Sequence, residues 1–461
     1  MSTGADPRLV AAAGSLRGEI RLPSDKSIAH RALLFNAMAS GSAEVTLSRP
    51  GADVLSTVEA LRLLGAVAAV QERDGSALVT VRGAGRPGAA QLPAGARERI
   101  DCGNSGTTMR LLCGALAGRS GATATELVGD GSLSSRPMER VAGPLRAMGA
   151  ELVTLDGHAP LRVLGRRPLR ALHHDLPIAS AQVLGAITLA ALAADGTTTI
   201  DTPAETRDHT ERLLAWLDAP VRREGTRTTI EGPAGMRARS LSVPGDVSSA
   251  AAWLVAATLH TDAELRLPGV SINPTRMAIV DVLREMGADI QVVSDEPAGA
   301  PSPSSPEPVG DLVVRSAAGL RPISLGGPPV ASLIDELPLI AVAMAAANGV
   351  SELRDAKELR IKESDRIAQV VRHLVALGVD AEELPDGWRV TGHRGSRPLP
   401  LAVTTGGDHR IGIAFAVAAL TGLSGEATID LPDCVDVSYP GFWNDLESIS
   451  GPVTAAAGPV R

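Results

Sequence analysis

Three stretches of the chain share one pattern: NSGTTMRLLCGALAG at 104–118, DELPLIAVAMAAANG at 335–349 and DHRIGIAFAVAALTG at 408–422. Each begins with small polar or charged residues, continues as a run rich in Ala and Leu, and closes at a glycine. That order is typical of a helix with a glycine at its C-terminal cap. Three further segments follow the pattern closely, at 24–41, 180–196 and 245–261. The six segments predict an internal repeat.

A second motif recurs in step with the first. It reads L-x-x-h-G-A or a close variant, and it occurs at 61–66, 145–150, 283–288 and 374–379, with weaker copies at 213–219 and 446–451. Between the two motifs lie short alternating segments bounded by Gly, Asp and Pro, which predict strands; they are 77–82, 161–164, 227–231 and 387–391. One Ala-rich helix would carry no weight, because such helices occur in any α/β protein. Six in phase predict a repeat of two helices and a small sheet, divided three and three between two domains.

The composition limits the function classes. At 461 residues the chain exceeds what one core serves, and its net charge of -8 argues against a general binder of nucleic acid or other polyanions. The three cysteines have no metal-ligand spacing and favour a reducing cytoplasm. Asp6, Pro7 and Arg8 stand where a signal peptide needs an apolar run, and no later stretch reads as a membrane span. We therefore expect a soluble, untargeted protein, with the Pro/Ser-rich stretch 296–310 as an exposed loop inserted within one unit.

The predicted helix starts carry the residue types that bind anions. A helix N-terminus presents unpaired N–H groups and the positive end of the helix dipole, which favour a phosphate or carboxylate. Ser, Asn, Asp and Thr are also ordinary N-caps, so no single start indicates a ligand. Lys26 and Arg31 are harder to explain, because the dipole disfavours cations there. A bound anion would remove that conflict.

Eight motifs carry a resemblance to a known family. They are LPSDKSIAHR at 22–31, GNSGTTMR at 103–110, SSRPM at 134–138, ASAQ at 179–182, TRDHT at 206–210, DELP at 335–338, RIKESDR at 360–366 and GDHR at 407–410. With these motifs in order along nearly its whole length, the chain resembles the 5-enolpyruvylshikimate-3-phosphate synthase family of enolpyruvyl transferases.

The resemblance implies a two-domain inside-out α/β barrel with three repeats in each domain. The lower, discontinuous domain would comprise 1–24 and 243–461, and the upper domain 25–242, with crossovers near 22–26 and 241–245. The domains would close on the substrates, which are shikimate 3-phosphate and phosphoenolpyruvate. The resemblance also implies a monomer with no metal or organic cofactor, and no nucleic-acid or membrane partner.

The resemblance also assigns the site residues. Around shikimate 3-phosphate it places Lys26, Ser27, Arg31, Ser180, Gln182, Arg207, Asp335 and Lys362. Around phosphoenolpyruvate it places Lys26, Gly106, Arg136, Gln182, Arg366 and Arg410. The arginines suit paired carboxylate or phosphate oxygens. If 358–366 is helical, Lys362 and Arg366 share a face and could bridge both ligands; taken alone, that stretch also reads as an exposed mixed-charge helix.

The implied reaction needs three proton-handling groups. The enol methylene carbon is protonated, the 5-hydroxyl attacks the cationic carbon, and phosphate leaves. The resemblance assigns Asp335 as the base at the hydroxyl, and Glu363 and Lys26 to the protons on the enolpyruvyl carbon and oxygen.

Departures from the family pattern bear on inhibitor sensitivity. Ala181 and Leu111 resemble the glyphosate-tolerant bacterial class, whereas Gly106 leaves room for that inhibitor, so sensitivity stays open. Val437 stands where a lysine can occur.

The residues argue against two rival functions. The first is a related transferase that acts on a UDP-amino sugar, which has Lys-Asn at its first motif and usually a cysteine in a loop. In this chain Ser27 follows Lys26, and 129–140 has no cysteine. A non-catalytic ligand-binding or scaffold protein would have no reason to combine Lys26, Asp335 and Glu363.

Overall fold

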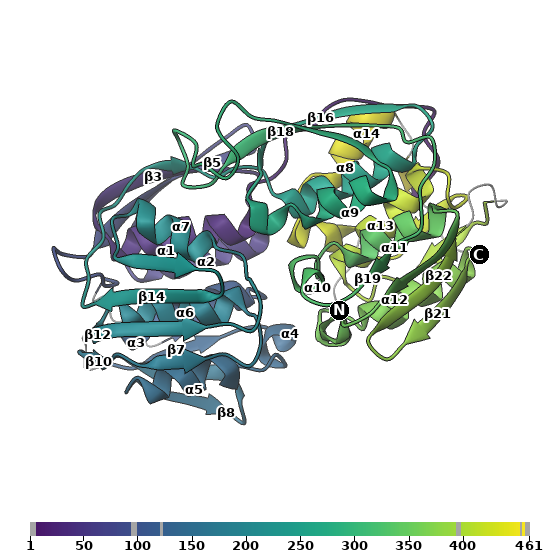
Figure 1. The fold of residues 1–461 in the computed structure, drawn as a ribbon. Coiled ribbons are helices and arrows are strands. Elements are labelled where there is room, and N and C mark those ends of the chain that lie inside the picture. The colour runs from purple at the N-terminus through teal and green to yellow at the C-terminus, as the bar shows by residue number, and fades with distance from the viewer. Residues whose placement is uncertain (1–5, 94–98, 120–122, 393–397, 452–453, 457–461) are drawn as a thin grey trace. The chain divides into compact units, whose positions relative to one another are not determined.

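The computed structural model describes residues 6–93, 99–119, 123–392, 398–451 and 454–456. It divides into two compact units (Figure 1). Unit 1 comprises 1–23, 245–300 and 308–461, and unit 2 comprises 24–244 and 301–307. Parts of both chain ends, including much of the C-terminal tail, lie outside the described residues.

The described residues of unit 2 form three small sheets. Their strand orders are β15(Leu241–Ser242)-β3(Ser40–Ser48)-β5(Ser76–Ala84)-β4(Val67–Arg73), β6(Arg99–Asp101)-β7(Thr125–Val128)-β9(His158–Leu164)-β8(Glu151–Leu155), and β10(Leu169–Arg170)-β12(Ala194–Asp201)-β14(Arg227–Gly232)-β13(Val221–Glu224), with β11(His173–Asp175) also on β12.

Unit 1 repeats the arrangement. Its sheets are β2(Leu16–Glu19)-β16(Ala263–Ser271)-β18(Val309–Arg315)-β17(Asp289–Val293), β19(Ser324–Leu325)-β20(Gly349–Leu353)-β22(Gly387–Gly392)-β21(Asp380–Leu384), and β23(Leu401–Val403)-β24(Ala427–Ile429)-β1(Arg8–Val10)-β25(Thr454–Ala456). In the described part of the chain, every sheet has the same pairing pattern: a first pair that is parallel, followed by two antiparallel pairs. This shared pattern is what a repeated unit predicts.

Two kinds of helix accompany the sheets. The first kind is buried almost all round and consists of α1(Lys26–Met38), α3(Gly106–Ala117), α6(Ala181–Ala191), α8(Val247–Leu259), α11(Leu337–Ala346) and α13(His409–Leu420). The second kind buries one face and consists of α2(Ala52–Leu63), α5(Glu139–Ala147), α7(His209–Trp216), α9(Ala278–Met286), α12(Arg366–Ala376) and α14(Phe442–Ser450). A helix that is apolar all round must be enclosed, whereas an amphipathic one covers a surface.

The buried helices form the core of each unit. In Figure 1, α6 packs against β12 and β14 in unit 2, and α8 packs against β16 and β18 in unit 1. The core residues of the two units form separate clusters that are mainly aliphatic. The predicted helix and strand repeat is therefore confirmed as a mixed α/β fold. The remaining short helices are α4(Gly131–Ser134), α10(Pro329–Ser332), η1(Pro274–Arg276), η2(Lys357–Ile361) and η3(Pro432–Val437).

The predicted glycine caps are confirmed at two buried helices and wrong at three. Gly118 is the C-cap of α3, and Gly422, with φ of 73°, directly follows the last turn of α13. Gly41, Gly196 and Gly349 instead lie within the strands that follow their helices. The second motif also supplies left-handed caps, as at Gly287, which ends α9 with φ of 113°. Strand glycines also allow close approach, because a Cβ at Gly83 would lie 2.0 Å from the carbonyl oxygen of Ala39.

The expectation for 296–310 is wrong in its second half. Glu296 is exposed, but Ser305 and Glu307 are buried, with 1% and 0% exposure. Segment 301–307 belongs to unit 2, although the chain on either side of it belongs to unit 1. The Ser242 N–H donates to the carbonyl oxygen of Ser304 at 3.0 Å, which attaches the segment beside β15.

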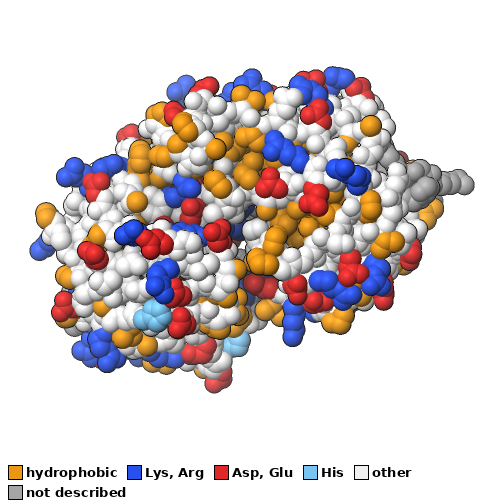
Figure 2. All heavy atoms as spheres, viewed as in Figure 1, with side chains coloured by type: hydrophobic (Ala, Val, Ile, Leu, Met, Phe, Trp, Pro, Cys, Tyr) orange, Lys and Arg blue, Asp and Glu red, His pale blue; other side chains and the backbone are white. Residues whose placement is uncertain are grey.

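The surface mixes charges of both signs. On the face drawn in Figure 2, Lys and Arg side chains alternate with Asp and Glu side chains. This agrees with the expectation that the protein is not a general binder of polyanions. Within the described residues, no helix has both the length and the apolar character needed to cross a membrane.

Candidate active site

The predicted site residues of unit 2 lie at the starts of its buried helices. Lys26 and Ser27 open α1, Gly106 opens α3, and Ser180 is the N-cap of α6, accepting a hydrogen bond from the Val183 N–H. Gln182 is in the first turn of α6. The helices begin here because each polar cap is followed directly by an apolar run that the core encloses.

Arg31 joins three helices of unit 2. Its Nε donates to Thr210 Oγ1 on α7 at 2.8 Å, Nη1 to the Ser27 carbonyl at 3.0 Å, and Nη2 to the Ala181 carbonyl at 3.3 Å. Burial lowers the pKa of Arg31 to about 10, Glu211 and Asp25 counteract this, and Arg207 adds to the lowering. Arg31 therefore keeps its charge at neutral pH, within electrostatic reach of Arg207.

Gly106 lies against two guanidinium groups. A Cβ added there would lie 2.9 Å from Nη1 of Arg110 and 3.5 Å from Nη1 of Arg136. Arg110 Nη1 donates to Oε1 of Gln182 at 2.5 Å, and Gln182 Nε2 donates to Thr107 Oγ1 at 2.8 Å. Ala181 and Gln182 are consecutive, so Arg31 and Arg110 approach the start of α6 from neighbouring helices. Unit 2 thus gathers Arg31, Arg110 and Arg136 around the starts of α3 and α6.

Sequence reasoning missed three partners in unit 2. Arg110 and Asn104 stand inside a quoted motif but received no role; Asn104 Oδ1 accepts from Arg136 Nη2 at 2.8 Å. Asp53 carries no motif signal, yet its Oδ2 lies 2.9 Å from Nζ of Lys26. The conflict between Lys26 and the dipole of α1 therefore has an answer within the protein, and a bound anion is not needed to explain it.

In unit 1 the site is organised around Arg366, the first residue of α12. This guanidinium is 1% exposed. Its Nε lies 2.9 Å from Asp408 Oδ2, Nη2 lies 2.7 Å from Glu363 Oε2, and Nη1 lies 3.8 Å from Asp335 Oδ1. Three carboxylates thus surround one buried cation. Nη1 has no hydrogen-bond partner among the described residues.

The charges in this cluster shift one another. Burial alone would lower the pKa of Arg366, but Asp408, Glu363 and Asp335 outweigh it and hold that pKa above its ordinary value. Burial would raise the pKa of Asp408, but Arg366 and His409 bring it down to about 2. Burial lowers the pKa of His409 to about 3, with a further contribution from Arg410. At neutral pH Asp408 is ionised and His409 is neutral.

Arg410 lies in the first turn of α13, beside this cluster. Its backbone N–H donates to Asp408 Oδ1 at 3.0 Å, and its Nη1 donates to the Ser248 carbonyl at 3.3 Å. Its Nε is buried and has no hydrogen-bond partner within the described part of the chain. Asp335, Glu363, Arg366 and Arg410 are thus brought together in unit 1.

The predicted helix around Lys362 is wrong. A 3₁₀ turn, η2, ends at Ile361, Lys362 is extended, and α12 begins at Arg366. Lys362 and Arg366 therefore do not share a helix face. Lys362 instead forms an ion pair with Glu358 at 3.2 Å.

A buried polar network beside Arg410 was also missed. Arg276 Nη2 donates to Ser248 Oγ at 2.6 Å, and the same hydroxyl bonds Glu336. Arg276 and Glu336 are 4% and 2% exposed. Arg276 lies in a stretch with no period and no matched motif, so the sequence carried no signal for it.

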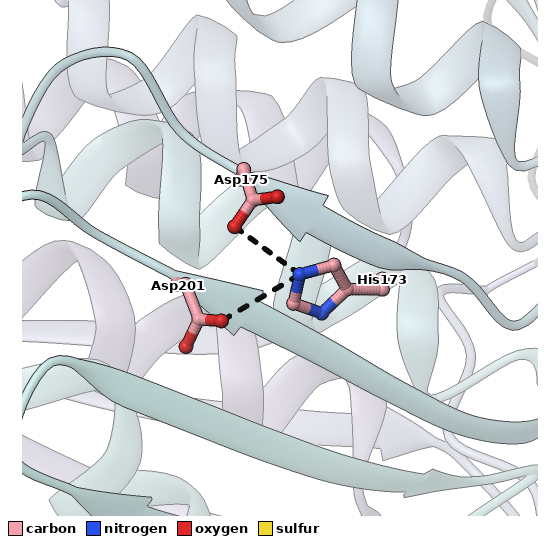
Figure 3. Close-up of side chains that lie close together, drawn as sticks. All are labelled: His173, Asp175 and Asp201. Carbon is pink, nitrogen blue, oxygen red and sulfur yellow. Dashed lines mark hydrogen bonds and ion pairs between the residues drawn. The ribbon is translucent and has the colours of Figure 1, made fainter.

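Two groups of His and carboxylate side chains in the described residues have the spacing of metal ligands. In Figure 3, His173 Nε2 lies 3.1 Å from Asp175 Oδ1 and 3.6 Å from Asp201 Oδ2. Both oxygens of Asp201 already accept from Arg227, at 2.8 and 2.7 Å, so we interpret this group as a surface ion-pair cluster. The other group is Asp208, His209 and Glu307, of which Asp208 is paired with Arg212 at 2.8 Å.

The comparisons with known proteins identify one enzyme family. The sequence model of the family described as EPSP synthase (3-phosphoshikimate 1-carboxyvinyltransferase) matches residues 10–446. The 3-phosphoshikimate 1-carboxyvinyltransferase of Chloroflexus aurantiacus is 46% identical over 439 residues, covering 94% of this chain and 97% of that protein. The protein of the same name from Gloeobacter violaceus is also 46% identical, covering 94% and 96%.

Solved structures show the same fold. The EPSP synthase of Acinetobacter baumannii superposes with a TM-score of 0.83 at 34% identity, covering 98% of this chain and 100% of that one. The enolpyruvyl transferase NikO of Streptomyces tendae superposes with a TM-score of 0.73 at 20% identity, covering 99% and 100%, which supports the fold alone. The sequence matches and the fold thus define an enolpyruvyl transferase. Within that class, the chain belongs to the EPSP synthase (3-phosphoshikimate 1-carboxyvinyltransferase) family and is an enzyme of that family.

Proposed function

We infer that the chain transfers the enolpyruvyl group of phosphoenolpyruvate to the 5-hydroxyl of shikimate 3-phosphate and releases phosphate, a step of aromatic amino acid biosynthesis. Family membership over almost the whole chain supports the activity. The observation that carries the residue roles is the buried Arg366, whose spare Nη1 donor lies beside Asp335 and whose Nη2 holds Glu363. A buried donor with no acceptor suits an anionic substrate.

The substrates divide between the two sets of residues. Ser27, Arg31, Ser180 and Arg207 would bind shikimate 3-phosphate, with Lys362. Gly106, Arg136, Arg366 and Arg410 would bind phosphoenolpyruvate. Lys26 and Gln182 would contact both substrates, and Asp335 the first. The network of Arg110, Gln182 and Thr107 supports this assignment, because it fixes the Gln182 amide between two helix starts.

The acid–base roles follow from the unit 1 cluster. Asp335 would accept the proton of the attacking hydroxyl, and Glu363 and Lys26 would handle the protons on the enolpyruvyl group. Glu363 is held in place by Arg366, whose Nη2 lies 2.7 Å from Glu363 Oε2. A substrate anion that engages Arg366 would compete with Glu363 for this guanidinium.

Phosphate release with purified protein and only the two substrates tests the activity. We expect release that depends on both compounds, and a UDP-amino sugar in place of shikimate 3-phosphate should give none. Asp335→Ala and Glu363→Ala should each lower kcat by about 100-fold or more, the scale of general acid–base groups, with a much smaller loss of shikimate 3-phosphate binding. Absence of turnover in the wild type would contradict the function, and near-normal turnover in both variants would contradict the roles.

The domain assignment, the oligomeric state and the cellular location are also proposals. We propose that unit 2 is the upper domain and unit 1 the discontinuous lower domain of the family fold. A monomeric state and a cytoplasmic location stay predictions.

A further inference from the structure

Segment 301–307 is anchored in unit 2 through a buried carboxylate. Glu307 Oε1 lies 2.8 Å from Nδ1 of His209, and both side chains are 1% exposed. The segment is also folded on itself, because the Ser302 N–H donates to the Glu307 carbonyl at 3.1 Å and the Glu307 N–H to Ser305 Oγ at 3.3 Å. The chain returns to unit 1 at Pro308, directly after the anchor. Glu307 is thus held in place from both its backbone and its side chain.

The partner of Glu307 begins the helix that orients Arg31. His209 is the first residue of α7, and the next residue, Thr210, accepts the Nε hydrogen bond of Arg31 at 2.8 Å. Thr210 is 0% exposed. The side chain of Arg31 therefore depends on where the first turn of α7 lies. Glu307 is also among the charges that act on Arg31.

The pair leaves His209 little freedom. A histidine nitrogen beside a carboxylate carries the proton and donates it, so the ring is fixed with Nδ1–H toward Glu307. Nε2 is buried and has no hydrogen-bond partner among the described residues, so the contact with Glu307 is the hydrogen bond that sets the orientation of the ring. If Glu307 is removed, a buried imidazole N–H loses its acceptor, and the start of α7 loses its attachment to 301–307.

We propose that Glu307 is a positioning residue for the binding of shikimate 3-phosphate. Through His209 it holds the first turn of α7, and through Thr210 that turn fixes Arg31, which lies between Ser27 and Ala181 at the proposed phosphate site. The inference rests on the proposed function, because it takes Arg31, Ser27 and Ser180 as ligands of that substrate. Glu307 itself does not contact the substrate.

The experiment measures binding of shikimate 3-phosphate to the full-length protein by calorimetry, together with KM for each substrate and kcat. Glu307→Ala should weaken binding of shikimate 3-phosphate by about 10-fold to 100-fold, the equivalent of one charge-assisted hydrogen bond. KM for phosphoenolpyruvate should change by less than about threefold, because Gln182, Arg110 and Arg136 are held by other bonds. Glu307→Gln keeps an acceptor for Nδ1–H and should recover most of the affinity. Glu296→Ala, an exposed carboxylate of the same insertion, is the matched control and should bind like the wild type.

A double-mutant cycle separates positioning from general destabilisation. Thr210→Val removes the acceptor of Arg31 Nε, so adding Glu307→Ala to it should cost much less affinity than Glu307→Ala costs alone. Full additivity, or unchanged affinity in Glu307→Ala, would overturn the proposal. If Glu307→Ala does not fold, a comparison of His209→Asn with His209→Leu tests the proposal. The Asn amide can still donate to Glu307, so His209→Asn should bind shikimate 3-phosphate more tightly than His209→Leu. Equal affinity in the two variants would refute the proposal. A wild type that neither binds shikimate 3-phosphate nor releases phosphate would instead refute the proposed function.

Discussion

Replacing Asp408 by Asn should destabilise unit 1 through one buried charge. Asp408 is 0% exposed and accepts four hydrogen bonds: from Arg366 Nε at 2.9 Å and Nη2 at 3.2 Å, from Ser364 Oγ at 2.9 Å and from the Arg410 N–H at 3.0 Å. The amide keeps the shape but loses the charge. Glu363 and Asp335 remain near Arg366, so the loss should lie at the lower end of the roughly 3–5 kcal/mol seen when a buried ion pair is broken.

The pKa of Asp408 gives a second measure of the same effect. Its pKa is lowered from 3.8 to about 2, which corresponds to about 2 kcal/mol at ~1.36 kcal/mol per pKa unit. A carboxyl whose pKa is lower in the folded state contributes stability that is complete above its unfolded pKa and is lost as the pH falls through its folded value. The window therefore runs from about pH 4 down to about pH 2. Both routes predict a loss of about 2–3 kcal/mol in Asp408→Asn at pH 7.

Urea unfolding followed by tryptophan fluorescence measures this loss. Of the four tryptophans, Trp253, Trp388 and Trp443 lie in unit 1, so a Trp216→Phe background reports on unit 1 alone. Glu382→Gln is the control, because its ion pair with Arg389 at 2.7 Å is 59% and 41% exposed and should contribute less than about 1 kcal/mol. The difference between Asp408→Asn and wild type should shrink toward zero below about pH 2. A difference that stays constant with pH, or one below about 0.5 kcal/mol at pH 7, would refute the electrostatic reasoning.

Three further predictions follow from single observations. In Gly106→Ala the new Cβ would lie 2.9 Å from Nη1 of Arg110, so the hydrogen bond from Arg110 to Gln182 must shift. KM for phosphoenolpyruvate should therefore rise by roughly tenfold. An unchanged KM together with unchanged glyphosate inhibition would contradict the assigned geometry. Burial chiefly lowers the pKa of His30 to about 3, so stability present above pH 6.5 should be lost toward pH 3, and His30 contributes about 1.4 kcal/mol per pH unit to this loss. His30→Gln, followed by Trp216 fluorescence, should reduce the slope by that amount. Burial also lowers the pKa of His174, so a smaller slope should remain, and an unreduced slope would contradict the assignment to His30. Burial raises the pKa of Cys102 and Cys434 to about 12 and raises that of Cys113 further. The three thiols should therefore react with a thiol reagent at pH 8 only once the chain unfolds. Fast labelling of the native protein would disprove their protection.

The repeat was predictable because a helix that is buried on all sides has an uninterrupted apolar run in its sequence. In α3 and α13 every residue is buried, so no polar face interrupts the apolar run, and the run ends where the core ends. The short parallel strands were not predictable in the same way. β10, β15 and β19 have two residues each, too few to show a period of two. Their positions are set by neighbouring strands, not by their own side chains.

The sequence motifs name candidate site residues, but they do not show which side chains contact one another. Lys26 and Asp53 stand 27 positions apart, and Ser248 and Glu336 stand 88 apart, so neither contact leaves a local pattern. The helix expected across Lys362 failed for a different reason. The i, i+4 spacing of charges around Arg366 imitates a helix, but Asp365 caps α12 by accepting from the Ala368 N–H, so the helix begins after it. The prediction for segment 301–307 failed because its composition suits a surface loop, whereas Ser305 and Glu307 are buried.

The buried helices also explain where this chain can place its chemistry. A helix enclosed on all sides cannot carry charge along its body, because an unpaired buried charge is too costly. Its first turns are the exception, since the free N–H groups and the dipole there stabilise carboxylates and bound anions. The cations of α1, α3 and α13 fall in the first two turns: Lys26 and Arg31, Arg110, and Arg410. The dipole does not favour them there, and polar partners hold them instead, as Asp53 holds Lys26. The repetition of one buried helix in each unit therefore supplies a set of polar helix starts, and the bodies of the same helices supply the core that holds those starts in place.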